Sequence, residues 1–233
     1  MMYQNSLDAD PNRDLKAIYV YAAPVRIWHW VMTAAMIVLV ATGLLIAYPP
    51  PSIGGEATDH FLFGYIRFTH FTAGYVLAIS WLVRVYWAIV GNDYTRQLFL
   101  VPVWSKPWWA EFFNDIKTYA FLPSAKPLRY AGHNPMAQLA MFFMATLGSF
   151  FMIITGFAMY SEGAGKGSWS DRLFGWVIPL FGQSQDVHTW HHLCMWLIVM
   201  FTTVHMYMVV RQEITTKESI LSTMVGGYRT FKD

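Results

Sequence analysis

Four long, almost uncharged segments limit this chain to folds that a lipid bilayer accepts. They span residues 28–48, 68–90, 136–160 and 187–210, and the only charged side chain within them is Arg84. A helix needs roughly 20 apolar residues to cross the hydrocarbon core. Only 13% of the residues are charged, against roughly 25% in a soluble domain, so four such helices could not be buried in a soluble core. We therefore predict an all-α fold: a four-transmembrane-helix bundle in a single domain covering residues 1–233.

Positive charges predict the orientation of this bundle, because Lys and Arg accumulate in cytoplasmic loops. With the N-terminus inside, thirteen of the sixteen basic residues lie on the cytoplasmic side, and only Arg67, Lys166 and Arg172 lie outside. We therefore expect both termini in the cytoplasm, and the first and third connections on the periplasmic or external side. The thirteen are Arg13, Lys16, Arg26, Arg84, Arg96, Lys106, Lys117, Lys126, Arg129, Arg211, Lys217, Arg229 and Lys232.

The second connection, residues 91–134, contains a further helical pattern. Its segment VPVWSKPWWAEFFNDIKTYAFL places bulky residues at helical spacing with charged residues between them: Trp108, Trp109, Phe112, Phe113, Ile116 and Tyr119. This pattern is typical of an amphipathic helix lying in the membrane interface. A solvated loop that packs through its aromatic residues is the alternative.

Four histidines lie at two depths of the predicted bundle. His29 and His205 lie near the inner ends of the first and fourth spans, and His70 and His191 near the outer ends of the second and fourth. Positions 191 and 205 are about 21 Å apart along a helix and share nearly one face. Neutral imidazole is a good axial ligand for haem iron. We predict two haems b, one held by His70 and His191 and one by His29 and His205, with His188 as the runner-up ligand on the fourth span.

Other roles for these residues stay open. A single histidine in a membrane can also form an interhelical hydrogen bond. Arg84 would be an isolated charge in lipid, so we expect it to bind a haem propionate or a quinone. We expect the same of Arg26, one turn before His29, unless its side chain only extends to the aqueous interface.

The segment from His188 to His192 also matches one H-x-x-H-H box of membrane diiron desaturases and hydroxylases. That chemistry needs several such boxes, and the other five histidines of the chain form no second one. A diiron membrane oxygenase is therefore a remote alternative, as is a transporter or a purely structural anchor. The single cysteine, Cys194, excludes a c-type haem attachment motif and a thiolate cluster for nickel or iron–sulfur binding.

An ordered set of motifs covers about residues 19–229: APVRIWHW, GYIRFTHFTAG, RVYWAIVGN, VPVWSKPWW, GHNPMAQLAMF, FMIITGFAMY and WHHLCMWL. In this order the motifs resemble those of the b-type cytochrome subunit of membrane-bound Ni/Fe-hydrogenases. Matched residue by residue, the resemblance assigns His70 and His191 to an outer haem and His29 and His205 to an inner haem.

The resemblance also implies a function and partners. The chain would be an electron-transfer subunit of the bacterial cytoplasmic (inner) membrane, and not an enzyme on its own. It would take electrons from the small subunit of a periplasmic Ni/Fe-hydrogenase, and through it from the large subunit, and pass them to membrane quinone. The gamma subunits of formate dehydrogenases share the di-haem plan, so another periplasmic oxidoreductase is the alternative partner.

We expect the quinone site at the inner surface, beside the inner haem, near His133 and Asn134. Quinone reduction takes up protons, and an imidazole and an amide at the membrane boundary could hydrogen-bond a quinone carbonyl and relay them. The alternative is structural, because Asn134 and Pro135 also suit the cap and first turn of a helix. The outer loops, with His60 and His188 close by, are expected to contact the hydrogenase. A net charge of +2 gives no reason to expect nucleic-acid binding.

Overall fold

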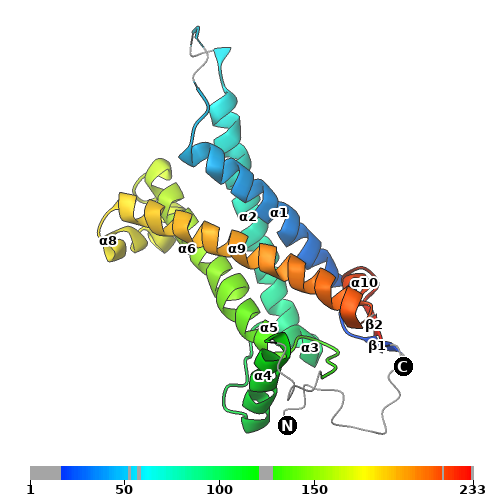
Figure 1. The fold of residues 1–233 in the computed structure, drawn as a ribbon. Coiled ribbons are helices and arrows are strands. Elements are labelled where there is room, and N and C mark those ends of the chain that lie inside the picture. The colour runs from blue at the N-terminus through cyan, green and yellow to red at the C-terminus, as the bar shows by residue number, and fades with distance from the viewer. Residues whose placement is uncertain (1–16, 52–53, 57–58, 121–127, 217, 232–233) are drawn as a thin grey trace. The chain divides into compact units, whose positions relative to one another are not determined.

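Helices make up most of the described chain (Figure 1). The computed structural model describes residues 17–51, 54–56, 59–120, 128–216 and 218–231. The basic residues Arg13, Lys16, Lys126, Lys217 and Lys232, counted above for orientation, lie outside these ranges. In chain order the elements are β1 (Ala17–Tyr19), α1 (Ala23–Ala47), α2 (Leu62–Val90), α3 (Asp93–Arg96), α4 (Lys106–Tyr119), α5 (Pro135–Ala140), the π-helix η3 (Met141–Leu147), α6 (Gly148–Ala164), α7 (Trp169–Phe174), α8 (Val177–Phe181), α9 (Ser184–Thr216), α10 (Ile220–Gly226) and β2 (Tyr228–Thr230).

Four helical segments are long and apolar enough to cross a membrane: Ala23–Ala47, Leu62–Val90, Pro135–Ala164 and Ser184–Thr215. The prediction of four transmembrane helices is confirmed, and each helix begins one to six residues earlier than predicted. In an apolar 18-residue stretch of the first span, and in one of the fourth span, only 11% of the residues are buried within the protein. Such helices leave their apolar side chains for lipid to cover, and the chain is an integral membrane protein.

The third span is not a regular α-helix throughout. It begins at Pro135, continues through the seven-residue π-helix η3 and resumes as α6 at Gly148. The hydroxyl of Thr146, buried in η3, donates a 3.1 Å hydrogen bond to the carbonyl of Leu98 in the loop after α3. A segment predicted to be a uniform helix therefore has a local widening that is tied to a neighbouring loop.

Internal contacts divide the chain into two compact units. Unit 1 comprises Met1–Arg26, Trp87–Phe151 and Trp196–Asp233, and unit 2 comprises Ile27–Tyr86 and Met152–Met195. Each of the four long segments contributes residues to both units. The prediction of a single domain therefore stays a prediction.

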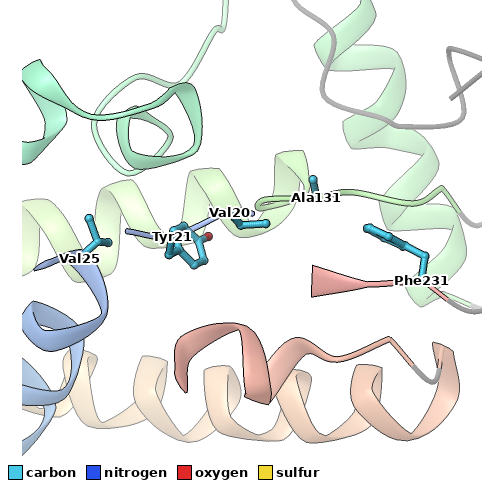
Figure 2. Close-up of a cluster of buried hydrophobic side chains, with 5 residues drawn as sticks. All are labelled: Val20, Tyr21, Val25, Ala131 and Phe231. Carbon is cyan, nitrogen blue, oxygen red and sulfur yellow. The ribbon is translucent and has the colours of Figure 1, made fainter. Parts of the chain in front are cut away.

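Unit 1 has a small apolar core that joins residues from both ends of the sequence (Figure 2). Its buried members are Val20, Tyr21, Val25, Ala131 and Phe231. Beside it, β1 pairs antiparallel with β2, with Ala17 opposite Thr230 and Tyr19 opposite Tyr228. The sequence analysis did not predict this ribbon.

A buried ion pair supports the same region. The guanidinium of Arg229 lies 2.7 Å from the carboxylate of Glu218, and both side chains are less than a tenth exposed. Arg229 also donates to the carbonyls of Ala131 and Gly132, at 3.4 and 3.2 Å. The charge pair therefore fixes the backbone immediately before His133.

Helix α4 forms where the sequence predicted a helix in the second connection. Ser105 caps it by accepting a hydrogen bond from the backbone N–H of Trp108, and Pro107 occupies its first turn. The fully buried indole of Trp108 donates a 2.9 Å hydrogen bond to the buried amide of Gln138 in α5. Trp109 and Phe113 are exposed. Location of α4 in the membrane interface stays a prediction.

One charged position of α4 lies in an unexpected environment. Asp115 is only 5% exposed, and its carboxylate accepts a 3.3 Å hydrogen bond from the hydroxyl of Tyr130. Burial raises the pKa of Asp115 from its ordinary 3.8 to about 6, against the opposing effect of the hydrogen bonds from Tyr130 and the backbone of Met136.

Candidate functional site

His70 and His191, the pair expected to hold one haem, lie in unit 2 with matching polar partners. Nδ1 of His70, on α2, lies 2.9 Å from the hydroxyl oxygen of Thr42 on α1. Nδ1 of His191, on α9, lies 2.7 Å from the hydroxyl oxygen of Thr155 on α6. Each imidazole is thus held by a threonine from a different helix, and four helices contribute to the arrangement.

The hydrogen-bond directions indicate which ring nitrogen carries the proton. The hydroxyl of Thr42 donates to the carbonyl of Val38 at 2.6 Å, so its oxygen is left to accept the Nδ1–H of His70. In this tautomer Nε2 keeps its lone pair, so Nε2 is the ring atom that can bind a metal. Thr155 has a longer donor contact of the same kind, 3.4 Å to the carbonyl of Met152.

A glycine follows each of these threonines. A Cβ atom on Gly43 would lie 3.4 Å from Cε1 of His70, and one on Gly156 would lie 3.5 Å from Cε1 of His191. Any longer side chain would press on the imidazole. A methyl group would thus reach ordinary van der Waals contact with each ring, and glycine keeps both helices slim beside the imidazoles.

The donor set fits haem better than a multi-ligand metal centre. Two neutral imidazoles suffice for the axial positions of a haem iron. Within the described residues, which contain all eight histidines, no three His, Cys, Asp or Glu side chains form a group that could hold a metal ion. The described part therefore lacks the cluster that a diiron centre needs.

The neighbouring histidines of α9 have other surroundings. His188, the runner-up ligand, is exposed. The ring of His192 packs edge-on against Tyr48, with ring centres 6.2 Å apart. Among the three, His191 is the one that contacts Thr155.

The second predicted ligand pair is divided between the units. His29 lies in unit 2, partly buried, with its ring edge-on to Trp30 at 5.2 Å. His205 lies in unit 1, partly buried, and stacks on Phe201 with ring centres 5.8 Å apart. Their joint binding of a haem stays a prediction.

The two arginines differ in environment. Arg84 is 3% exposed, and its guanidinium lies 5.2 Å from the centre of the Trp28 ring, close enough for a cation–π interaction. Trp28 in turn packs edge-on against Trp81. Arg26 is partly buried and donates to the carbonyl of Val225, which ties the start of α1 to α10 within unit 1.

The predicted quinone segment has a clear local role. The Oδ1 atom of Asn134 accepts a 2.7 Å hydrogen bond from the backbone N–H of Ala137 and so caps α5, while its Nδ2 donates to the hydroxyl of Tyr119 at 3.0 Å. The guanidinium of Arg211 lies over the Tyr119 ring at 5.7 Å. The capping alternative is therefore correct for Asn134, whatever else the residue binds.

His133, next to this cap, is held from two sides. Its backbone N–H donates to the side chain of Gln97 at 2.9 Å, and Nδ1 lies 3.4 Å from the hydroxyl of Tyr21. The imidazole is partly buried.

The sequence analysis missed Thr42 and Thr155. The available signal was the repeated Thr-Gly dipeptide, at 42–43 in the first span and 155–156 in the third. A single glycine in a helix already suggests close packing. The same Thr-Gly dipeptide in two helices suggests in addition that the two threonines share a role.

Comparisons with known proteins identify the family of the chain. The sequence model described as prokaryotic cytochrome b561 matches residues 20–227. A protein of Azotobacter chroococcum mcd 1 named "Probable Ni/Fe-hydrogenase B-type cytochrome subunit" is 58% identical over 221 residues, covering 95% of this chain and 92% of the relative. A protein of the same name from Cupriavidus necator is also 58% identical, covering 95% of this chain and 90% of the relative.

A more distant relative extends the comparison. The protein of Escherichia coli K12 named "Probable Ni/Fe-hydrogenase 1 B-type cytochrome subunit" is 49% identical over 218 residues, covering 92% of this chain and 91% of the relative. The resemblance seen in the sequence motifs is confirmed, and b-type cytochromes carry haem b. The chain belongs to the prokaryotic cytochrome b561 family.

Proposed function

We propose that this chain is the di-haem b electron-transfer and membrane-anchor subunit of a Ni/Fe-hydrogenase complex in the bacterial inner membrane. One observation carries the proposal. His70 and His191 lie on two helices of one unit, and the Nδ1 atom of each ring contacts a threonine hydroxyl. This contact leaves Nε2 of each ring available to bind iron. The names of the relatives support hydrogenase as the partner. Bound haem supplies reversible one-electron transfer at its iron.

In this proposal the chain's own residues bind and shield the redox groups. His70 and His191 hold the outer haem, and His29 and His205 the inner one. The contact with Thr155 supports His191 over the exposed His188 as the ligand on α9. Apolar side chains of the four helices exclude water from the haem sites.

Arginine pairing with the inner haem or a quinone is part of the proposal. Arg84 is buried against Trp28, and a propionate or a reduced quinone would complement its charge. Arg26 is proposed for the same role at the start of α1, in addition to its bond to α10.

The proposed orientation follows from the charge distribution, and the proposed direction of electron transfer follows from an electron donor outside and a quinone inside. Both termini lie in the cytoplasm, and the outer connections contact the small subunit of the hydrogenase. The chain has a single cysteine, so hydrogen oxidation belongs to the partner. Electrons leave the inner haem to quinone near His133, with Asn134 holding that segment.

A spectroscopic experiment tests the haem ligands. The purified chain should give a b-type reduced-minus-oxidised spectrum with two haems per chain. His70→Ala and His191→Ala should each remove the same haem and leave the other. His188→Ala is the control and should retain both haems. If His188→Ala removes a haem while His191→Ala does not, the assignment on α9 is wrong.

A second experiment tests the partner. The affinity-tagged chain should co-purify with a nickel-containing protein, and hydrogen should reduce its haems in that complex. If formate reduces the haems of the isolated complex and hydrogen does not, the chain serves a formate dehydrogenase instead.

A third experiment tests the quinone segment. His133→Ala should slow quinone reduction while both haems are still reduced by the partner. Asn134→Ser keeps a capping oxygen but removes the amide that contacts Tyr119, whereas Asn134→Leu removes both. If all three variants reduce quinone at the normal rate with both haems intact, the site lies elsewhere.

A further inference from the structure

We propose that Thr42 and Thr155 are a matched pair of positioning residues, which fix the tautomer of His70 and His191 and lower the reduction potential of the haem that these histidines hold. The inference rests on the proposed ligand pair and concerns two residues outside it. Neither threonine would touch the iron, and each would act through the imidazole that it contacts.

The contacts of the two threonines distinguish them from other threonines of the long helices. Thr72 on α2 and Thr203 on α9 also donate to a carbonyl one turn earlier in their own helix, at 2.8 and 2.9 Å. Both are exposed, and among the described residues neither has a hydrogen bond to a histidine ring. Back-bonding to the helix is thus common here, whereas contact with Nδ1 is specific to Thr42 and Thr155.

The direction of the hydrogen bond gives the physical consequence. Because the Thr42 hydroxyl already donates to Val38, its oxygen accepts from the imidazole and draws the Nδ1 proton toward itself. This increases the basicity of Nε2 and stabilises the more positive, oxidised iron. The effect is not screened by water in an apolar helix bundle. For Thr155 the backbone acceptor is more distant, 3.4 Å to the carbonyl of Met152, so the same direction of the bond to His191 is part of the proposal. With both threonines accepting from Nδ1, the two bonds act on one iron and their effects should reinforce each other.

The bond also fixes the ring in place. A neutral imidazole has two tautomers, and only the one with a lone pair on Nε2 can bind through that atom. Without the hydroxyl, the Nδ1–H of His191 would lose its 2.7 Å partner, which costs free energy in an apolar environment. His70 would lose its 2.9 Å partner and keep only the contact with the backbone of Leu39, so the cost should be smaller at Thr42 than at Thr155. The threonines therefore select the binding-competent ring before haem enters.

The test uses valine, which has the shape of threonine without its hydroxyl. Thr42→Val, Thr155→Val and the double variant are purified in the full chain with its complex, and haem content and midpoint potentials are measured by redox titration. We expect the potential of the outer haem to rise, with a roughly threefold to tenfold lower oxidised-to-reduced ratio at a fixed potential, where tenfold corresponds to about 59 mV for a one-electron couple. The double variant should shift furthest, and the inner haem should not change.

Two control variants separate this role from a general effect on the helices. Thr72→Val removes a back-bonding hydroxyl two residues after His70 and should leave both potentials unchanged. Thr42→Ser and Thr155→Ser retain the hydroxyl and should restore the potential and the haem content. Loss of the outer haem in the valine variants with retention in the serine variants also supports the proposal.

Several results would overturn the inference. One is an unchanged potential and haem content in the double valine variant, and another is an equal shift caused by Thr72→Val. A third is equal loss of haem in the serine and valine variants, because the hydroxyl would then not be the active group. Retention of the outer haem by His70→Ala would instead refute the ligand assignment, which distinguishes failure of the proposed function from failure of this inference.

Discussion

Replacing Asp115 by asparagine should make the protein more stable at neutral pH. Asp115 is 5% exposed, and burial raises the pKa of its carboxyl group from 3.8 to about 6. The folded protein therefore binds the carboxyl proton more tightly than the unfolded chain does. Stability falls as the pH rises from about 4 to about 6, because the unfolded chain ionises first, and then stays constant.

The size of the effect follows from the same pKa values. A rise from 3.8 to about 6 corresponds to at most about 3 kcal/mol lost at pH 7.5. Asp115→Asn abolishes the charge and keeps an oxygen that can accept from Tyr130. We expect the variant to gain up to this amount at pH 7.5 and nothing at pH 4. With about 2 to 4 °C per kcal/mol for a protein of this size, the gain is visible in a melting curve.

The assay is thermal unfolding of the detergent-solubilised protein by circular dichroism at pH 4, 5, 6 and 7.5. The difference between wild type and variant isolates Asp115 from other groups that titrate in the same range. Asp93→Asn is the control: its side chain is 76% exposed in a surface pair with Arg96, so its removal should change stability little at any pH. A melting-temperature difference for Asp115→Asn that is negative, or equal at all four pH values, would refute the reasoning.

Three further predictions concern packing and charge. Gln138→Leu should lower the free energy of unfolding by about 1–3 kcal/mol, because it removes the acceptor of the buried Trp108 indole N–H, and thermal melts of the variant and the wild type check this. Glu218→Ala should cost about 3–5 kcal/mol by leaving Arg229 buried without its carboxylate, and a double change to Leu at both positions should recover part of that loss. Gly43→Leu should reduce haem content in a pyridine haemochrome assay, because even its Cβ would lie 3.4 Å from the imidazole on α2; normal content would show that the room beside this ring is not needed.

The sequence predicted the four spans well because apolar length is a local property. A run such as 136–160 needs no knowledge of its neighbours to be assigned to a membrane. The same holds for the cap at Asn134, since asparagine before proline is a local start signal.

The features that were missed depend on how helices face one another. Thr42 contacts His70 only because α1 and α2 present those faces to each other, and the same is true of Thr155 and His191. Burial of Asp115 depends on the position of Tyr130, which follows a segment outside the described residues. The π-helix over Met141–Leu147 has no residue signature that distinguishes it from a regular helix.

Pairing of β1 with β2 also has a consequence for biosynthesis. Ala17 is opposite Thr230, so the first strand leaves the ribosome long before its partner exists. At about 5–20 residues per second, the first strand waits roughly 10 to 40 s while all four membrane helices are made and inserted. Throughout that interval Val20 and Tyr21 lack Phe231 of their cluster, and the nascent chain exposes the apolar surface that chaperones and proteases recognise. A chain that stops before Tyr228 can neither form the ribbon nor bring Phe231 to the cluster.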